Sequence, residues 1–128
     1  MPTIFSQIVA GNIPCFRILE DDDFLAFLDV NPLVIGHVLV IYKKEIDYIF
    51  DLDDDVLGRM LIFSKKVAHL LKTKINCEKI GLSVIGLEVP HVHIHLVPIN
   101  VADDLNFTRA KLSLTPIQLE EIQTLLLG

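Results

Sequence analysis

Histidines alternate strictly with aliphatic residues in the segment His-Val-His-Ile-His-Leu-Val, residues 91–97. Such alternation indicates a β-strand, because a strand sends successive side chains to opposite faces. His91, His93 and His95 are therefore expected on one face, with neighbours roughly 6.6 Å apart along the strand. A row of three imidazoles has little to gain from burial, so we expect this face to carry chemistry.

The rest of the chain predicts an antiparallel α+β fold. Hydrophobic periodicity, capping residues and turn signals predict helices over residues 3–11, 51–72 and 115–127, and strands over 16–19, 24–28, 37–42, 79–85 and 89–97. Strands joined mostly by turns, with helices at one side, are typical of this class. The longest helix carries an apolar stripe made of Val56, Met60, Phe63, Val67 and Leu71. We see no linker, and we expect residues 1–128 to form a single domain.

Composition restricts the partners of such a domain. The chain has 17 acidic and 11 basic residues and a net charge of −6, which argues against binding to duplex nucleic acid but not against a small nucleotide. No apolar run approaches the ~20 residues that cross a bilayer, so we expect no membrane partner. Cys15 and Cys77 form no CxxC pattern, and the N-terminus does not resemble a secretory signal. We therefore expect a cytoplasmic protein with reduced thiols.

Three interpretations of the histidine row are open on residue chemistry alone. The rings could merely line a polar sheet face, although strands do not favour histidine. Two of them could bind Zn²⁺, but a straight strand does not aim three rings at one ion, and no cluster of carboxylates or thiolates adjoins the row. The third interpretation is catalysis at phosphorus, in which a neutral imidazole attacks while its neighbours hold the phosphate and the leaving group.

The residues also match a known pattern. The segment 91–97 fits the signature His-φ-His-φ-His-φ-φ, in which φ is apolar, and resembles the histidine triad, or HIT, nucleotide hydrolases and transferases. The order and spacing of other segments are similar too: Ile4-Phe5 with Ile8, then residues 11–14, 20–29, 31–32 and 36–41. The resemblance points to a bacterial-type, nucleoside phosphoramidase-like member of the family. It implies a five-stranded antiparallel sheet with a main helix packed on it and short N- and C-terminal helices.

The resemblance also implies roles for individual residues. His93 would be the nucleophile, His91 would orient its ring, and His95 would bind phosphate oxygens and assist the leaving group. His37 matches a further histidine of the site, and Asp29 matches the carboxylate that accepts the ribose hydroxyls. The apolar walls around the base would be Ile4, Phe5, Ile8, Phe27 and Val30, although ordinary core packing explains Ile8 and Phe27 almost as well.

The implied activity is hydrolysis of nucleoside phosphoramidates, or of related nucleoside monophosphate esters and anhydrides, through a nucleotidyl-histidine. Two alternatives are cleavage of dinucleoside polyphosphates and a nucleotide-binding module with little turnover. The ligand would be a small molecule containing a nucleoside monophosphate, purine preferred, and the protein would be a homodimer. No cofactor is implied. A structural zinc is not expected, because Thr3 and Ser6 stand where many bacterial relatives have cysteines and Glu45 lies near the position of a histidine.

The loop before the triad departs from the family pattern. Residues 83–90 are several residues shorter than usual, and Leu87 stands where an amide side chain is common. That loop normally donates hydrogen bonds to the phosphates. The sequence leaves open whether Glu88 reaches the site, and the stretch after Pro98 adds little to the resemblance.

Overall fold

The computed structural model describes residues 2–128. The helices are α1 (Ile4–Val9), α2 (Asp54–Lys74) and α3 (Pro116–Leu127), with short 3-10 helices η1 (Ile49–Asp51) and η2 (Ala102–Leu105). The strands are β1 (Arg17–Glu20), β2 (Phe24–Leu28), β3 (Val38–Tyr42), β4 (Lys79–Ser83) and β5 (His93–Ile99). They form one sheet in the order β1-β2-β3-β5-β4, and every neighbouring pair is antiparallel. The predicted α+β class and the five-stranded antiparallel sheet are confirmed.

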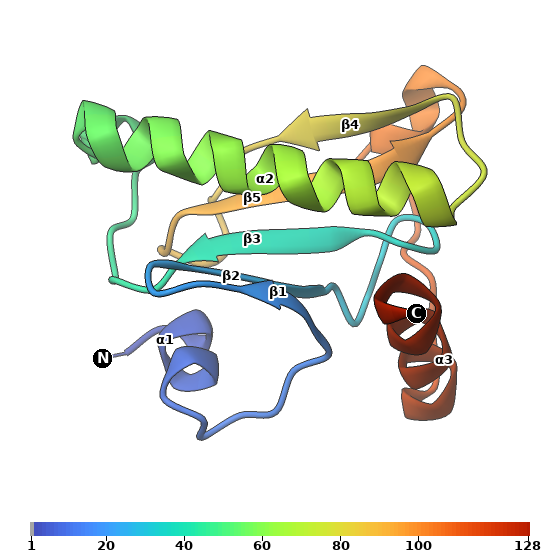
Figure 1. Ribbon diagram of the computed structural model, residues 1–128, viewed down its shortest axis with the longest axis horizontal. Coiled ribbons are helices and arrows are strands. Elements are labelled where there is room, and N and C mark those ends of the chain that lie inside the picture. The colour runs from blue at the N-terminus through green and yellow to red at the C-terminus, as the bar shows by residue number, and fades with distance from the viewer. Residues whose placement is uncertain (1) are drawn as a thin grey trace.

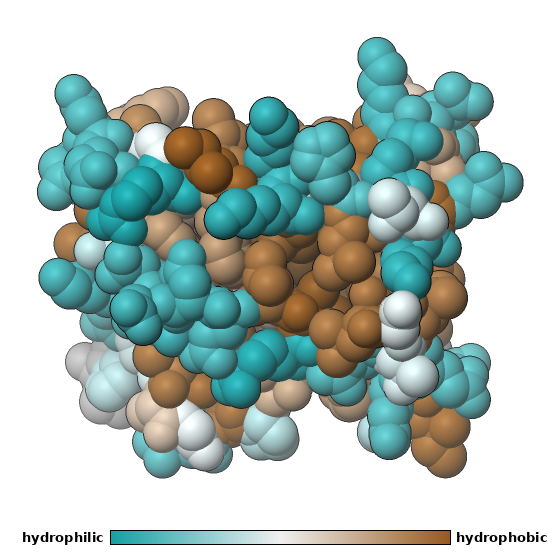
Figure 2. All heavy atoms as spheres, viewed as in Figure 1, coloured by the Kyte–Doolittle hydropathy of each residue, from teal (hydrophilic) through white to brown (hydrophobic). Residues whose placement is uncertain are grey.

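The helices cover the two faces of the sheet unequally. Side chains of α2 and α3 share the larger hydrophobic core with one face, while Phe5 and Ile8 of α1 pack on the other face with Leu39 and Ile41. Figure 1 shows α2 running in front of the sheet, with α1 at the lower left and α3 at the lower right of the view. On the same view, polar side chains cover much of the outer surface of α2, with some hydrophobic ones among them, and further hydrophobic side chains gather between α2 and α3 (Figure 2). Within residues 2–128, no helix combines the length and apolarity needed to cross a bilayer.

Helix α2 begins where its capping residue lies. The Asp53 side chain accepts a hydrogen bond from the backbone N–H of Val56, which satisfies one of the free donors of the first turn. The helix therefore starts at Asp54 and not at residue 51, and η1 occupies the residues before it. The predicted apolar stripe is buried along its whole length. At the other end of the chain, where a helix was predicted over residues 115–127, a capping box of Thr115 and Gln118 starts α3.

The last strand is displaced from its predicted position. Strand β5 begins at His93 and ends at Ile99, whereas alternation predicted residues 89–97, and β4 ends at Ser83 instead of residue 85. Pro90 has no N–H to offer a neighbouring strand, and the N–H of His91 turns back to the carbonyl of Val89. His91 thus precedes the strand that holds the other two histidines of the row.

Candidate active site

A cavity of about 540 Å³ opens on the α1 side of the sheet, and we call it the α1 cavity. Its walls come from α1 and the loop after it, the end of β2 and the loop after it, β3, the β4–β5 loop, β5 and the segment before α3. It is lined by Ile4, Phe5, Ile8, Ile13, Pro14, Cys15, Phe27, Leu28, Asp29, Val30, Asn31, Leu39, Ile85, Gly86, Leu87, Glu88, Val89, His93, His95, Phe107 and Lys111. The structure therefore brings all six residues suggested for nucleotide binding to one hollow.

The histidine row is divided between the cavity and the interior. His93 and His95 line the cavity and are 7% and 9% exposed, whereas His91 and His37 lie behind it and are 0% and 1% exposed. All four rings are buried, so the expectation that the row gains little from burial was wrong. The physical reason is that hydrogen bonds satisfy the buried ring nitrogens, which removes the cost of taking them out of water.

The ring of His93 is held in one tautomer. Its Nδ1 lies 2.6 Å from the backbone carbonyl oxygen of His91. A carbonyl only accepts, so Nδ1 carries the proton and Nε2 keeps its lone pair. The edge of the ring packs against Phe5 at a centroid distance of 4.9 Å, and burial lowers the pKa of His93. His93 is therefore a neutral imidazole at pH 7, with an unprotonated nitrogen on a ring that lines the cavity.

Both nitrogens of His91 are occupied. Its Nε2 donates to the carbonyl oxygen of Tyr42 at 2.6 Å, so its Nδ1 accepts the hydroxyl proton of Thr3 at 2.7 Å. The same Thr3 oxygen accepts the N–H of Ser6 and caps α1. His91 has no free nitrogen for chemistry, and its carbonyl holds the ring of His93. The arrangement is compatible with the orienting role that the resemblance implies for His91.

A carboxylate ties this network to the loop after β3. One oxygen of Glu45 accepts from the N–H of Thr3 at 2.7 Å and from the hydroxyl of Ser6 at 2.8 Å. These bonds hold the pKa of the Glu45 carboxyl below its usual range. Thr3, Ser6 and Glu45 occupy the positions at or near which many bacterial relatives have zinc ligands, and their presence was the reason for expecting no structural zinc. Their donors and acceptors satisfy one another and His91, and two hydroxyls are not zinc ligands of choice.

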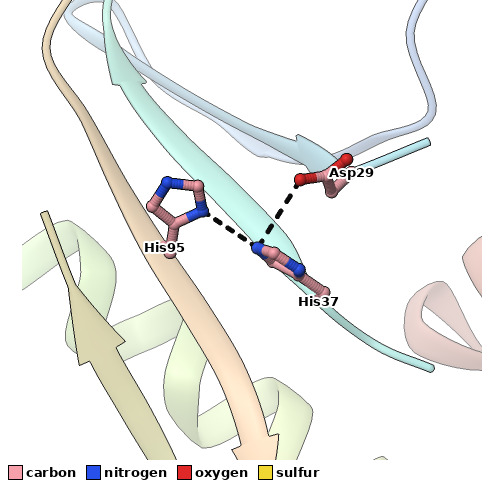
Figure 3. A group of neighbouring side chains, drawn as sticks. All are labelled: Asp29, His37 and His95. Carbon is pink, nitrogen blue, oxygen red and sulfur yellow. Dashed lines mark hydrogen bonds and ion pairs between the residues drawn. The ribbon is translucent and has the colours of Figure 1, made fainter. Parts of the chain in front are cut away.

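His37 and His95 form a hydrogen-bonded pair at the other end of the cavity, and we call this pair the relay. The backbone N–H of Leu33 donates to Nδ1 of His37 at 3.0 Å, so the proton of that ring lies on Nε2. Nε2 lies 3.0 Å from Nδ1 of His95 and 3.6 Å from a carboxylate oxygen of Asp29 (Figure 3). His95 therefore accepts at Nδ1 and carries its own proton on Nε2. Burial lowers the pKa of His37 to about 4 and that of His95 to about 3, so both rings are neutral at pH 7.

The same three residues could be mistaken for a metal site. Asp29, His37 and His95 each place one ligand atom within 4.8 Å of the others. A neutral imidazole that binds a metal through Nε2 carries its proton on Nδ1. In His37 that proton would collide with the N–H of Leu33. The backbone thus selects the tautomer that donates from Nε2, and the group fits a hydrogen-bonded relay better than a metal.

Phe107 and Lys111 are among the cavity residues that sequence reasoning missed. The ring of Phe107 lies 4.6 Å from that of His95 and 6.1 Å from that of His37. Both residues belong to an irregular segment without periodicity, and the stretch after Pro98 was expected to add little. The contact of this segment with the β2–β3 loop, distant in sequence, is the information that the pattern lacked. Glu88, left open by the sequence, also lines the cavity, and Leu87 is 90% exposed at its rim.

Comparison with known proteins agrees with this geometry. The family model of the HIT domain matches residues 10–101. The chain belongs to the HIT family. An uncharacterized HIT-like protein of Borreliella burgdorferi is 37% identical, and the match covers 93% of this chain and 91% of that protein.

Solved structures of HIT proteins share the fold. A HIT-like protein of Bartonella henselae, described as involved in cell-cycle regulation, superposes with a TM-score of 0.83 at 27% identity, over 98% of this chain and 94% of that one. A zinc-bound histidine triad protein of Mycobacterium smegmatis gives a TM-score of 0.81 at 29% identity, over 97% and 89% of the two chains. Membership of the HIT family supports a nucleotide-binding, hydrolase-like protein.

Proposed function

We propose that this HIT protein hydrolyses nucleoside phosphoramidates, or related nucleoside monophosphate esters and anhydrides, through a nucleotidyl group on His93. One observation carries the proposal. The bond from Nδ1 of His93 to the carbonyl of His91 leaves an unprotonated Nε2 on a neutral ring that lines the cavity. A neutral imidazole in this tautomer is a nucleophile at pH 7.

The two chemical steps use the same rings. In the first, Nε2 of His93 attacks the α-phosphorus, the bond from phosphorus to the leaving nitrogen or oxygen breaks, and the leaving group departs with a proton that reaches it from solvent through the Nε2–H of His95. In the second, water attacks the adduct, the P–Nε2 bond to His93 breaks, and the proton from water passes directly to solvent while the Nε2–H of His95 donates to a phosphate oxygen. His37 holds His95 in the donating tautomer throughout.

The remaining cavity residues hold the nucleoside in this proposal. One oxygen of Asp29 accepts the N–H of Asn31, which leaves acceptor capacity for the ribose hydroxyls. Ile4 and Val30 are each 50% exposed, at the positions expected to cover a base, and we propose a purine there. The deeper apolar wall is formed by Phe5, Ile8 and Phe27, which also belong to the smaller hydrophobic core.

The test is incubation of the protein with adenosine 5′-phosphoramidate, with AMP release followed by chromatography and the protein by intact mass. We expect AMP as product and a transient mass increase of one adenylyl group. Faster cleavage of diadenosine tetraphosphate than of the phosphoramidate would favour the second reaction considered above. AMP binding without turnover of any substrate would leave the protein a nucleotide-binding module and overturn the proposal.

We also propose that residues 1–128 form one HIT domain that associates as a homodimer through β4. Strand β4 lies at one edge of the sheet, beside a groove of about 400 Å³ between α2 and β4. Leu61 and Ile62 of α2 and Leu82 of β4 line this groove and are 54%, 59% and 45% exposed. Exposed apolar side chains beside the free edge of an outer strand are what a two-fold, self-complementary interface buries.

Replacing Leu82 with lysine is therefore expected to produce a monomer, because two like charges would face each other across the two-fold axis. Sedimentation velocity at micromolar concentration measures the change. A matched control is Ile117→Lys, a residue of α3 that is 69% exposed and lies outside the groove. We expect the control and the unchanged protein to remain dimers, and a monomeric unchanged protein would contradict the proposal.

A further inference from the structure

The α1 cavity has an unusual charge balance for a phosphate site. Among the residues that line it, Asp29 and Glu88 carry negative charge, and Lys111 is the one lysine or arginine. The histidines contribute no positive charge at pH 7, because burial lowers the pKa values of His93 and His95. A bound phosphate adds negative charge to a partly dehydrated site, which costs free energy unless a cation faces it.

We propose that Lys111 is the residue that recognises the phosphate charge of the nucleotide and so sets the preference for a nucleotide over a nucleoside. The inference rests on the proposed function and deepens it. In this protein the loop before the triad is short, and the C-terminal segment, residues 106–112, delivers the cation instead.

The structure holds the C-terminal segment firmly beside the histidines. The N–H of Leu112 donates to the carbonyl of Pro32 at 2.8 Å, and the guanidinium of Arg109 donates to the carbonyl of Leu33 at 3.2 Å. Both acceptors lie in the loop that also fixes His37. The segment is thus attached to the same backbone that sets the tautomer of the relay.

The ammonium group of Lys111 is directed by the same segment. Its Nζ donates to the carbonyl oxygen of Phe107 at 3.2 Å, and the ring of Phe107 packs on that of His95 at 4.6 Å. An ammonium has three N–H donors, so two remain for a ligand. Burial raises the pKa of Asp29 and lowers that of His95, and the positive charge of Lys111 opposes the first shift and adds to the second, so the ammonium is near enough to act on both groups.

A competing explanation is that Lys111 acts only on the carboxylate of Asp29 and not on the phosphate. In that case the lysine would tune the carboxylate that holds the ribose, and its loss would weaken adenosine and AMP equally. Recognition of phosphate predicts a different result, because adenosine lacks the group that Lys111 binds. A pair of ligands that differ only in the phosphate therefore separates the two explanations.

The experiment is calorimetric titration of the unchanged protein and of Lys111→Met with AMP and with adenosine. We expect the variant to bind AMP about 10- to 100-fold more weakly, the range for a charged hydrogen bond, with adenosine affinity unchanged. Lys111→Arg should retain most of the AMP affinity, because it keeps the charge. Lys72→Met, an exposed residue of α2 on the opposite face of the sheet, is the matched control and should change neither affinity.

Each outcome decides the inference. A loss confined to AMP supports it. Equal losses for both ligands, or no loss for either, overturn it while the proposed hydrolysis can still be measured on the unchanged protein. Failure of the unchanged protein to bind both ligands would instead overturn the proposed function, and the inference with it. Thermal unfolding of each variant checks that the substitution leaves the fold intact.

Discussion

The variant His93→Ala is expected to lose hydrolysis of adenosine phosphoramidate by a factor on the order of 10⁴ or more in kcat, because the atom that forms the covalent intermediate is gone. The adenylyl adduct should disappear from the mass spectrum as well. Binding of AMP should survive within several-fold, since the ribose carboxylate, the apolar wall and Lys111 are untouched. Steady-state kinetics, intact mass and calorimetry together measure these three effects.

Two controls make this result specific to the ring of His93. The first is His69→Ala, an exposed histidine of α2, which should keep full activity because α2 packs on the other face of the sheet. The second is His93→Gly assayed with added imidazole, which should recover part of the turnover if the missing function is nucleophilic attack. Full activity in His93→Ala would remove the mechanism altogether.

Local patterns predicted much of this fold because they depend on few residues at a time. Alternation placed His93 and His95 on the face that carries the cavity, and the register confirms their neighbours, with Ile41 opposite His93 and Leu39 opposite His95. The 3.6-residue period of α2 and the cap at Thr115 follow the same logic, whereas the cap at Asp53 was not predicted. Periodicity did not predict where β5 begins, because that depends on Pro90 and on partners in other strands.

Most site contacts that the sequence did not predict join distant segments. Thr3 meets His91 across 88 positions, and His37 meets His95 across 58. The guanidinium of Arg109 reaches the carbonyl of Leu33 across 76 positions. Such contacts fix the tautomers of His91 and His95, whereas the ring of His93, the nucleophile of the proposed mechanism, is fixed by the carbonyl of His91 two residues away. Alternation alone treats the three histidines of the row as equivalent, and the structure shows that they are not.

The stability of the protein is expected to fall as the pH drops from about 6.5 towards 4. In the unfolded chain the rings of His37 and His95 titrate near 6.5, whereas burial lowers their pKa values to about 4 and about 3 in the folded protein. Between these limits the unfolded state binds more protons, so stability rises with pH in that window and levels off above it. For His37 alone the effect is about 3 kcal/mol, at 1.36 kcal/mol for each pH unit of difference.

Urea unfolding at pH 7, 6, 5 and 4.5 measures this dependence. Glu45 and Asp104, whose pKa values are also lowered, lose their contribution only near and below pH 4.5, and the raised pKa of Asp29 acts in the opposite direction. The slope between pH 6.5 and 5 therefore belongs to the buried histidines. A double variant, His37→Gln with His95→Gln, should flatten it even if its stability at pH 7 is lower.

A flat profile in the unchanged protein would have a consequence beyond stability. It would mean that the rings accept protons in the folded state as readily as in water. A protonated His37 would carry hydrogen on Nδ1, against the N–H of Leu33, and a protonated His95 could not accept from His37. The hydrogen bond that gives His95 its donating Nε2–H requires both rings to be neutral. The proposed protonation of the leaving group therefore requires the same lowered pKa values that the pH dependence of stability measures.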